Sequence, residues 1–207
     1  MNIKIKKLAP DFIEDYLHFF ETDAHSDNPN EDRCYCVCWC SADHRIETDF
    51  SSPEKRRDLA IKYINEGIIQ GYLAYLDDKV VGWCNANTKS ECLNCTSWIR
   101  FKTTVNITES SSDVKIKSIY CFVIAPNMRR KGVSALLLDR VCKDAADEGF
   151  DFVEAYPEQK FTNVFNAMSG HLELYKRKGF IIYQKINDKY KGIYDLNYNV
   201  VRKSLKP

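Results

Sequence analysis

The stretch Ile119–Val141, which reads IYCFVIAPNMRRKGVSALLLDRV, decides the fold of this chain. Residues 119–125 are apolar on both faces and rich in β-branched and aromatic side chains, which favours a strand in the middle of a sheet. Pro126 ends that strand, and a basic turn over residues 129–132 follows it. From Val133 onward apolar residues recur with helical spacing, which predicts a helix directly after the turn.

A strand, a basic turn with one glycine and a helix, in this order, suit an anion-binding site. The first N–H groups of a helix have no partner within the helix, so they face the turn together with Arg129, Arg130 and Lys131. The turn lacks both the G-x-x-x-x-G-K-[ST] and the G-x-G-x-x-G patterns of nucleotide-binding loops. A phosphate site is one interpretation of this turn, and a solvated surface loop is the other.

These residues resemble the acetyl-CoA motif of the GNAT-type N-acetyltransferases. The core pattern of that family is Arg/Gln-x-x-Gly-x-Gly/Ala; Arg129 and Gly132 match it, and Ser134 replaces the last small residue. Downstream, residues 174–180 read LYKRKGF and match the family's Leu-Tyr-x-x-x-Gly-Phe signature. The two motifs stand in the family's order and spacing, and the resemblance covers residues 70–186.

The remaining patterns predict an α/β fold, with one domain over residues 1–207 and helices on both faces of a mixed sheet. Strands are expected at residues 3–8, 72–76, 80–85, 150–156, 180–186 and 193–201, and helices from Pro10, from Ser52, where Ser-Pro suits a cap, and from Ser169. Residues 77–79 should join their flanking strands in a hairpin, and residues 90–101 favour no single element. The resemblance implies a mostly antiparallel sheet of about six to seven strands, whose fourth and fifth strands part around the cofactor. Residues 1–70 match the family less well, and we expect them on the acceptor side.

The composition argues against several kinds of partner. The formal net charge of +1 gives no general affinity for nucleic acid or for a membrane surface. No stretch approaches the ~20 apolar residues of a membrane span, and the N-terminus does not read as a signal peptide. Nine cysteines without a secretion signal predict reduced thiols and a cytoplasmic protein, and a homodimer is compatible with the sequence.

The resemblance implies transfer of an acetyl group from acetyl-CoA to a primary amine of a small molecule or peptide, without a covalent enzyme intermediate. It places the cofactor's pyrophosphate on the basic turn and its pantetheine arm along the main chain of the central strand. The residues expected to bind acetyl-CoA are Phe122, Val123, Ile124, Arg129, Arg130, Lys131, Gly132, Val133, Ser134 and Ala135.

Two residues are expected to move protons. Tyr175 matches the family's usual general acid, which protonates the departing thiolate; the alternative is a core aromatic. An alkylamine with a pKa near ~10.4 must lose a proton before it attacks, and Glu154, on the strand beside the central one, is the expected base. The alternative for Glu154 is a solvent-facing strand residue.

The segment Cys34–Cys40 carries a cysteine at every second position, and an extended chain would project all four to one side. Only Cys92 and Cys95 have the spacing of a structural zinc site, so we expect no metal and favour packed, reduced thiols. Tyr35 and Trp39 are interpreted as walls of the acceptor pocket, because in the resembling family the loops around the first two helices shape that pocket.

Three functions therefore compete. An active acetyltransferase is favoured by Tyr175 and by the intact signature over residues 174–180. A CoA-binding module without catalysis and a metal- or thiol-sensing protein on the same fold are the alternatives. Aminoglycosides, polyamines, amino acids and protein N-termini all remain open as acceptors.

Overall fold

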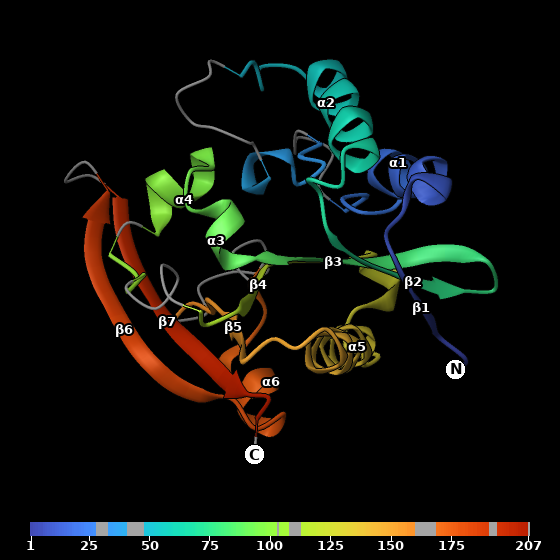
Figure 1. Cartoon of the computed structure of the whole chain (residues 1–207). Helices are drawn as coiled ribbons and strands as arrows, with labels where there is room; N and C mark the ends of the chain where they lie inside the picture. Colours follow the sequence, from blue (N-terminus) through green and yellow to red (C-terminus); the bar gives the residue numbers. More distant parts are fainter. Residues whose placement is uncertain are drawn as a thin grey trace.

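The computed structural model describes residues 1–27, 33–40, 48–102, 104–107, 113–159, 169–190 and 194–206. They form a seven-stranded mixed sheet with the strand order β1-β2-β3-β4-β5-β7-β6 (Figure 1). The strands are β1 Lys4–Lys7, β2 Gly71–Leu76, β3 Lys79–Thr88, β4 Ile116–Ile124, β5 Phe152–Ala155, β6 Ile181–Tyr190 and β7 Tyr194–Ser204. The predicted α/β fold class, with a mostly antiparallel sheet, is confirmed.

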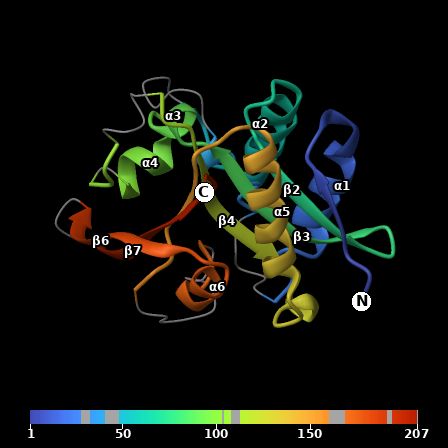
Figure 2. The ribbon, with the colours of Figure 1, turned by 60° about the horizontal axis from the view of Figure 1, so that its bottom comes forward.

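Helices cover both faces of this sheet. On one face lie α1 and α2 together with the short helices α3 and α4, and on the other lie α5 and α6 (Figures 1 and 2). The α-helices are α1 Ile13–Thr22, α2 Pro53–Asn65, α3 Lys89–Cys92, α4 Thr96–Phe101, α5 Val133–Asp147 and α6 Leu172–Arg177. The 3-10 turns are η1 Pro10–Phe12, η2 Val37–Trp39 and η4 Pro126–Met128.

The sheet is antiparallel at every junction except one. β4 and β5 run parallel, and their paired residues extend from Ile116↔Phe152 to Ile119↔Ala155. β4 then continues to Ile124, whereas β5 has already ended. Within the described part of the chain the sheet is therefore open between these two strands beyond Ile119.

Local sequence signals account for several of the element boundaries. The Ser52 hydroxyl accepts a hydrogen bond from the Lys55 backbone N–H at 3.3 Å, which caps α2 as the Ser-Pro start predicted. Asp77 and Asp78 both have positive φ, 49° and 62°, and close the predicted β2–β3 hairpin as a two-residue turn. These predictions depend on neighbours in sequence, and they are confirmed.

Several boundaries differ from the predictions. β3, β6 and β7 extend further, to Thr88, Tyr190 and Ser204, and β5 is limited to Phe152–Ala155. β4 begins at Ile116 rather than Ile119, because the polar residues Lys117 and Ser118 are buried inside the strand. Helix α6 begins at Leu172 with His171 at its cap, so Ser169 does not cap it; Gly170, with φ of 79°, turns the chain between them. The stretch from Ser90 to Phe101, which favoured no single element, lies in α3 and α4.

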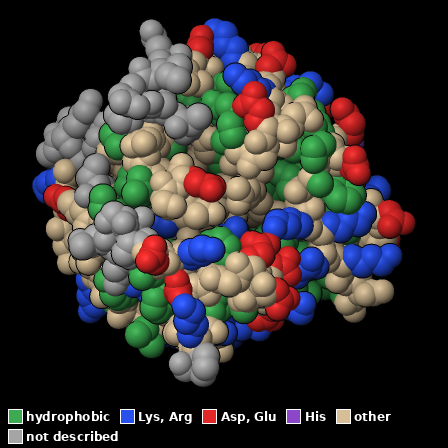
Figure 3. Space-filling view, viewed as in Figure 1, with side chains coloured by type: hydrophobic (Ala, Val, Ile, Leu, Met, Phe, Trp, Pro, Cys, Tyr) green, Lys and Arg blue, Asp and Glu red, His purple; other side chains and the backbone are tan. Residues whose placement is uncertain are grey.

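The surface agrees with a near-neutral chain. On the face shown in Figure 3, basic and acidic side chains are interspersed, consistent with the formal net charge of +1. In the described ranges, no helix is both long and apolar enough to cross a membrane.

The core between α1 and the sheet is closed around Trp83 on β3. Its side chain is fully buried, and the ring of Tyr16 meets it edge-on with centroids 4.9 Å apart. Gly71, at the start of β2, lies against the same ring: a Cβ there would sit 2.3 Å from the ring atom Cη2 and 2.2 Å from the Cys84 carbonyl oxygen. The absence of a side chain at Gly71 therefore permits the pairing of β2 with β3.

We expect Gly71→Ala to destabilise the fold by about 3 kcal/mol, because overpacking against backbone cannot be relieved by a rotamer change. Urea unfolding measures this. Gly67→Ala is the control: its Cβ would meet nothing within 4 Å, and only the positive φ of 70° adds a cost, about 1 kcal/mol. Equal stability of the two variants would contradict the close packing at Gly71.

Candidate active site

The opening between β4 and β5 begins at a β-bulge. Cys121 opposes Asn85 on β3 and Ile119 opposes Ala86, so Tyr120 is an extra residue without a partner on that strand. The bulge follows directly on the last pair between β4 and β5. Bulges bend a strand and redirect its side chains, and they are frequent beside active sites. From Tyr120 onward β4 presents main-chain groups to the opening without a β5 partner in the described chain.

The turn that leads from β4 to α5 lies at one end of this opening. Gly132 caps α5 with φ of 83°, and its carbonyl accepts from the N–H groups of Ala135 and Leu136 at 3.0 and 3.2 Å. Across the described residues, the N–H groups of residues 132–134 donate to no backbone acceptor. Arg130 and Lys131 are exposed, and a Cβ on Gly132 would meet nothing within 4 Å. The turn thus combines free donors, positive charge and open space, which suit an anion.

Arg129 makes a different set of contacts. Its guanidinium pairs with both carboxylate oxygens of Asp27, with Nη2 3.2 Å from Oδ1, and its Nε donates to the Ile124 carbonyl at 3.3 Å. The hydrogen bond from Arg129 lowers the pKa of Asp27. Arg129 therefore braces the end of β4 against the segment after α1, and its role as a phosphate ligand stays a prediction.

Tyr175 lies at the opening from the side of α6. Its side chain is fully buried, its hydroxyl donates to the Ser169 carbonyl at 2.7 Å, and its ring meets Phe180 edge-on. A Cβ on Gly170 would be 3.2 Å from the Tyr175 hydroxyl and 3.4 Å from a ring carbon of Phe122. The side chains of Tyr175 and Phe122 therefore lie close to each other. Burial raises the pKa of Tyr175, which keeps the phenol protonated and able to act as an acid.

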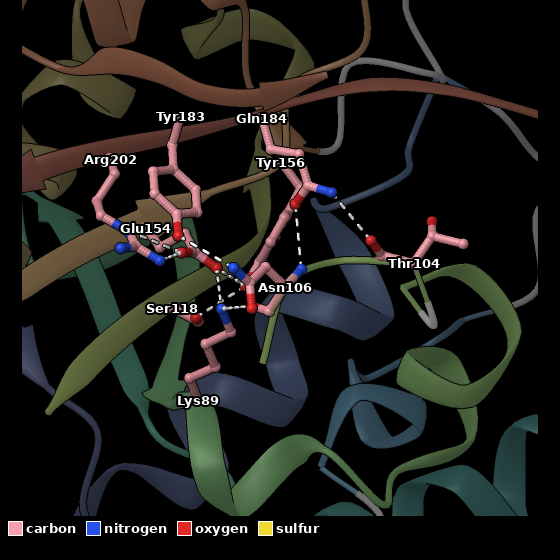
Figure 4. A network of polar contacts seen from close by, with 9 residues as sticks. All are labelled: Lys89, Thr104, Asn106, Ser118, Glu154, Tyr156, Tyr183, Gln184 and Arg202. Atoms are coloured by element: carbon pink, nitrogen blue, oxygen red, sulfur yellow. Dashed lines mark hydrogen bonds and ion pairs between the residues drawn. The ribbon is translucent and has the colours of Figure 1, made fainter. Parts of the chain in front are cut away.

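Glu154 on β5 is completely buried, so the alternative of a solvent-facing residue is wrong. Its Oε2 accepts from Nε and Nη2 of Arg202 at 3.0 and 2.7 Å, and its Oε1 lies 2.7 Å from Nζ of Lys89 (Figure 4). The Tyr156 hydroxyl also donates to Oε1, at 2.7 Å. One carboxylate is thus held by two cations and a phenol. Its role as a base stays a prediction.

The network extends from Glu154 to the segment after α4. Lys89 donates to the Asn106 carbonyl at 3.0 Å, and the Asn106 N–H donates to Oε1 of Gln184 on β6 at 3.1 Å. The amide of Gln184 donates in turn to the Thr104 carbonyl at 3.0 Å (Figure 4). These bonds tie residues 104–107 to both β5 and β6, and so fix the end of α4 that precedes them.

Aromatic rings line the start of the opening. Trp39 from η2 stacks on Tyr120 with centroids 4.9 Å apart, and Tyr120 stacks on Tyr156 at 5.7 Å. Trp98 from α4 meets Tyr120 and Tyr156 edge-on at 6.3 and 6.0 Å. The buried Tyr120 hydroxyl forms no hydrogen bond with any described residue. Rings from four separate segments thus converge where β4 and β5 part.

A lysine reaches into this group of rings. The ammonium of Lys102, at the end of α4, lies 3.7 Å from the ring centroid of Tyr198, 5.1 Å from that of Tyr156 and 5.7 Å from that of Trp39. Lys102 is only 7% exposed. Burial lowers the pKa of its amine to about 7, and the charge of Glu158 opposes that shift.

The cysteine segment is not extended. Tyr35 and Cys36 have positive φ, 45° and 50°, and the 3-10 turn η2 follows, so alternate residues do not share one side. The Cys36 sulfur accepts from the Trp83 indole at 3.4 Å, which agrees with packed, reduced thiols. Among the described residues, no group of three or more His, Cys, Asp or Glu side chains is arranged to hold a metal.

The two predicted pocket residues of this segment lie in different surroundings. Trp39 belongs to the rings at the opening. The ring of Tyr35 is buried and packs on Phe20 of α1 at 5.6 Å, in the core between the helices and the sheet. The structure therefore brings Trp39, but not Tyr35, to the ring cluster with Tyr120 and Tyr156.

Comparison with known proteins identifies the family. The model of the acetyltransferase (GNAT) family matches residues 11–180, and the chain therefore belongs to this family. The acyltransferase class predicted from the two motifs is confirmed. A search of curated proteins finds no match.

Solved structures share the fold. The N-acetyltransferase of Staphylococcus aureus Mu50 has 14% identity and a TM-score of 0.57, with 100% of each chain covered. The polyamine N-acetyltransferase of Drosophila melanogaster has 13% identity and a TM-score of 0.57, covering 98% of this chain and 100% of that one. The ribosomal-protein-alanine N-acetyltransferase of Brucella melitensis has 13% identity and a TM-score of 0.54, covering 97% and 99%. At these identities the likeness shows the fold alone.

Sequence analysis did not single out Lys89, Lys102 or Arg202. Each is buried, which is unusual for a charged side chain, and each meets its partners through contacts far apart in the chain. One sequence signal could have pointed to Arg202. Arg202 continues the alternating pattern of β7 and belongs to a run of buried residues that pairs with β5. For the two lysines we find no local pattern that separates them from surface lysines.

We expect Glu154→Gln to lower the free energy of unfolding by about 3–5 kcal/mol, because it leaves the buried charges of Arg202 and Lys89 without a counter-charge. Thermal and urea unfolding measure the loss. Glu173→Gln is the control, since Glu173 has a 68% exposed side chain and forms a surface ion pair; its effect should stay within about 0.5 kcal/mol. A Glu154→Gln protein as stable as the parent would refute the structural role of this carboxylate.

Proposed function

We propose that this protein transfers an acetyl group from acetyl-CoA to a primary amine of a small molecule or peptide. The observation that carries the proposal is the opening between β4 and β5, with a donor-rich turn at one end and converging rings at the other. The family generally uses acetyl-CoA, which agrees with this geometry. One protein of the same fold is described as forming N-acetylagmatine, a reaction on an amine.

The turn before α5 would hold the pyrophosphate of the cofactor. Unpaired N–H groups at a helix start carry partial positive charge, and the exposed Arg130 and Lys131 add to it. Gly132 contributes through its positive φ and through the space that a missing side chain leaves. Ser134 and Ala135 belong to the first turn of α5; Ser134 would take part through its backbone N–H, whereas the Ala135 N–H already donates to the Gly132 carbonyl.

The main chain of Phe122 to Ile124 would bind the pantetheine arm. Amides of that arm can pair with an open strand edge as an added strand does. The unpaired side of β4 supplies such an edge within the described structure, and it leads from the turn back toward Tyr120. This route brings the acetyl thioester, which is the reactive group the cofactor supplies, to the rings at the opening.

Protons would move through separate groups. Tyr175 protonates the departing thiolate from its place beside Phe122. The contacts of Glu154 favour a positioning role over that of a base, because Arg202, Lys89 and Tyr156 already occupy both oxygens of its carboxylate. The acceptor amine then loses its proton to water, helped by the low polarity of the site. A cytoplasmic location and a homodimer stay predictions.

A turnover screen tests the proposal as a whole. Free thiol release from acetyl-CoA is measured over aminoglycosides, polyamines, amino acids and peptides with free N-termini. Release that depends on both enzyme and amine supports an acetyltransferase. Tight acetyl-CoA binding without turnover for every class would instead indicate a CoA-binding module.

We expect Gly132→Asp to weaken acetyl-CoA binding about 100-fold or more, because it places a carboxylate beside the pyrophosphate charge. The fold should survive, since a Cβ at this position meets nothing within 4 Å. Gly67→Asp is a matched control: Gly67 also has positive φ, 70°, and open surroundings, but lies at the end of α2. Isothermal titration calorimetry with equal affinity for both variants would remove the pyrophosphate assignment.

We expect Tyr175→Phe to reduce kcat by roughly 10²-fold to 10⁴-fold, the usual range for one general acid, with a small change in acetyl-CoA affinity. The deficit should shrink as pH rises, because a thiolate leaves more easily unaided when it need not be protonated. Steady-state kinetics measure both effects.

Tyr16→Phe is the control for lost packing. Tyr16 is equally buried, and its hydroxyl also donates to a backbone carbonyl, that of Tyr35, at 2.7 Å. Both variants should lose about 1–3 kcal/mol of stability. If Tyr175→Phe and Tyr16→Phe show the same kcat, Tyr175 is a core aromatic and not the acid.

A further inference from the structure

We propose that the cage of Trp39, Tyr156 and Tyr198 is the acceptor site, that it takes a primary amine at the end of an unbranched alkyl chain, and that Lys102 fills it as an internal acceptor. The proposal rests on the proposed function for its acetyl donor. It goes further by naming the acceptor's chemistry and a modification site within the chain.

The cage has the geometry of a cation-binding site. The Lys102 ammonium lies 3.7, 5.1 and 5.7 Å from the ring centroids of Tyr198, Tyr156 and Trp39. All three lie within the ~6 Å at which a cation is attracted to a ring face, and such cages are a known means of binding alkylated ammonium groups. The rings come from β7, from the residue directly after β5 and from η2, so the fold assembles the cage from three distant segments.

The cage lies close to the end of the pairing between β4 and β5. Tyr156 directly follows Ala155, the last β5 residue paired with β4, and it stacks on the bulged Tyr120. The cage therefore begins where the two strands part, next to the strand edge assigned to the pantetheine arm. An amine in the cage is placed beside the end of the route along which the thioester would lie.

Lys102 is held at the cage by its backbone. Its N–H donates to the Trp98 carbonyl at 2.8 Å, and its carbonyl accepts from Val105 at 3.0 Å. The Tyr198 hydroxyl also donates to the carbonyl of the preceding residue, Phe101, at 2.8 Å. A lysine at a helix end normally extends its ammonium into water. Here the main chain fixes the residue so that its four-carbon side chain reaches the rings instead.

The cage provides no close counter-charge among the described residues. Among the described residues, the Lys102 ammonium forms no ion pair with a carboxylate; Glu158 acts on it from a longer distance. The phenols of Tyr156 and Tyr198 stay neutral, because burial raises the pKa of each. An ammonium surrounded by rings without a close counter-charge is costly for stability, and a site that must accept an amine accounts for that cost.

The same surroundings prepare the amine for attack. Burial lowers the pKa of Lys102 to about 7, so a large share of the amine is neutral at physiological pH. An external alkylamine in the cage would meet the same low polarity and lose its proton in the same way. The cage thus reduces the need for a carboxylate base, which agrees with the ion pairs that occupy Glu154.

The step on Lys102 is an acetyl transfer from bound acetyl-CoA to a side chain of the same protein molecule that binds it. The lone pair of the neutral Nζ forms a bond with the carbonyl carbon of acetyl-CoA, and the carbon–sulfur bond breaks. CoA departs with the bonding pair as a thiolate. The proton that Nζ loses passes through water, and the thiolate is protonated to the free thiol. The products are Nζ-acetyl-Lys102 and CoA, with no oxidant or reductant required.

The first test is acetylation of the full chain by acetyl-CoA alone. Peptide mass spectrometry should show one acetyl group on Lys102 long before the exposed Lys143, whose side chain is 72% accessible. The Lys102 rate should rise with pH and level off above about 7, whereas the Lys143 rate should keep rising. Gly132→Asp should abolish the reaction at Lys102 and leave the slow chemical reaction at Lys143 unchanged.

The second test uses steady-state kinetics with n-butylamine and 1,4-diaminobutane as acceptors. Lys102→Ala empties the cage and should lower KM for both amines about tenfold, with the acetyl-CoA affinity unchanged. Lys102→Met keeps the rings covered by a neutral chain, so it should leave KM high while abolishing acetylation at position 102. Lys143→Met is the matched surface control. All variants are first compared with the parent by thermal unfolding.

The outcomes separate this inference from the proposed function. If the parent turns over acetyl-CoA with an external amine, but Lys102 is acetylated no faster than Lys143 and Lys102→Ala leaves KM unchanged, the cage assignment is overturned and the acetyltransferase stands. If the parent neither binds nor turns over acetyl-CoA, both the cage assignment and the proposed acetyltransferase function are wrong. Rapid acetylation of Lys102 together with the lower KM in Lys102→Ala supports the cage as the acceptor site.

Discussion

The arrangement around the opening depends on the buried charge of Glu154. This one carboxylate pairs with Arg202 from β7 and Lys89 from α3, and it accepts a hydrogen bond from the hydroxyl of Tyr156, directly after β5. Desolvation offsets much of the Coulomb energy of such buried pairs, so their main contribution is to fix positions rather than to add stability. Through Lys89 and Asn106 the same charge holds the segment after α4, and with it the place of Lys102.

The opening itself follows from where two strands end. β5 is short and is followed by Pro157, which has no N–H to donate to a ladder, whereas β4 runs on until Ile124. The bulge at Tyr120 adds one residue to β4 at the same level and redirects its side chains. A difference in strand length thus exposes a main-chain edge, and an edge of this kind binds amides whatever side chains flank it.

Sequence analysis found the features that depend on neighbouring residues. The cap of α2, the Asp77–Asp78 hairpin and the glycine turn before α5 each carry their signal within a few positions, and the structure has them where they were predicted. It placed the start of β4 too late, because Lys117 is a charged residue inside a buried strand. The partners that compensate the desolvation of a buried charge lie far away in sequence, as Glu154 does for Lys89, so no local pattern indicates them.

The two buried lysines near the opening, Lys89 and Lys102, differ in their surroundings. That difference gives Lys89 a structural role and Lys102 a chemical one. Lys89 lies against a carboxylate, and this buried ion pair with Glu154 holds its ammonium in place. Lys102 lies against ring faces, which attract the ammonium too weakly to offset desolvation, so its pKa falls toward neutrality. A carboxylate placed beside the cage would keep the acceptor amine charged and slow its attack. With its ion pairs to Lys89 and Arg202, Glu154 orders the site while its own charge is already compensated.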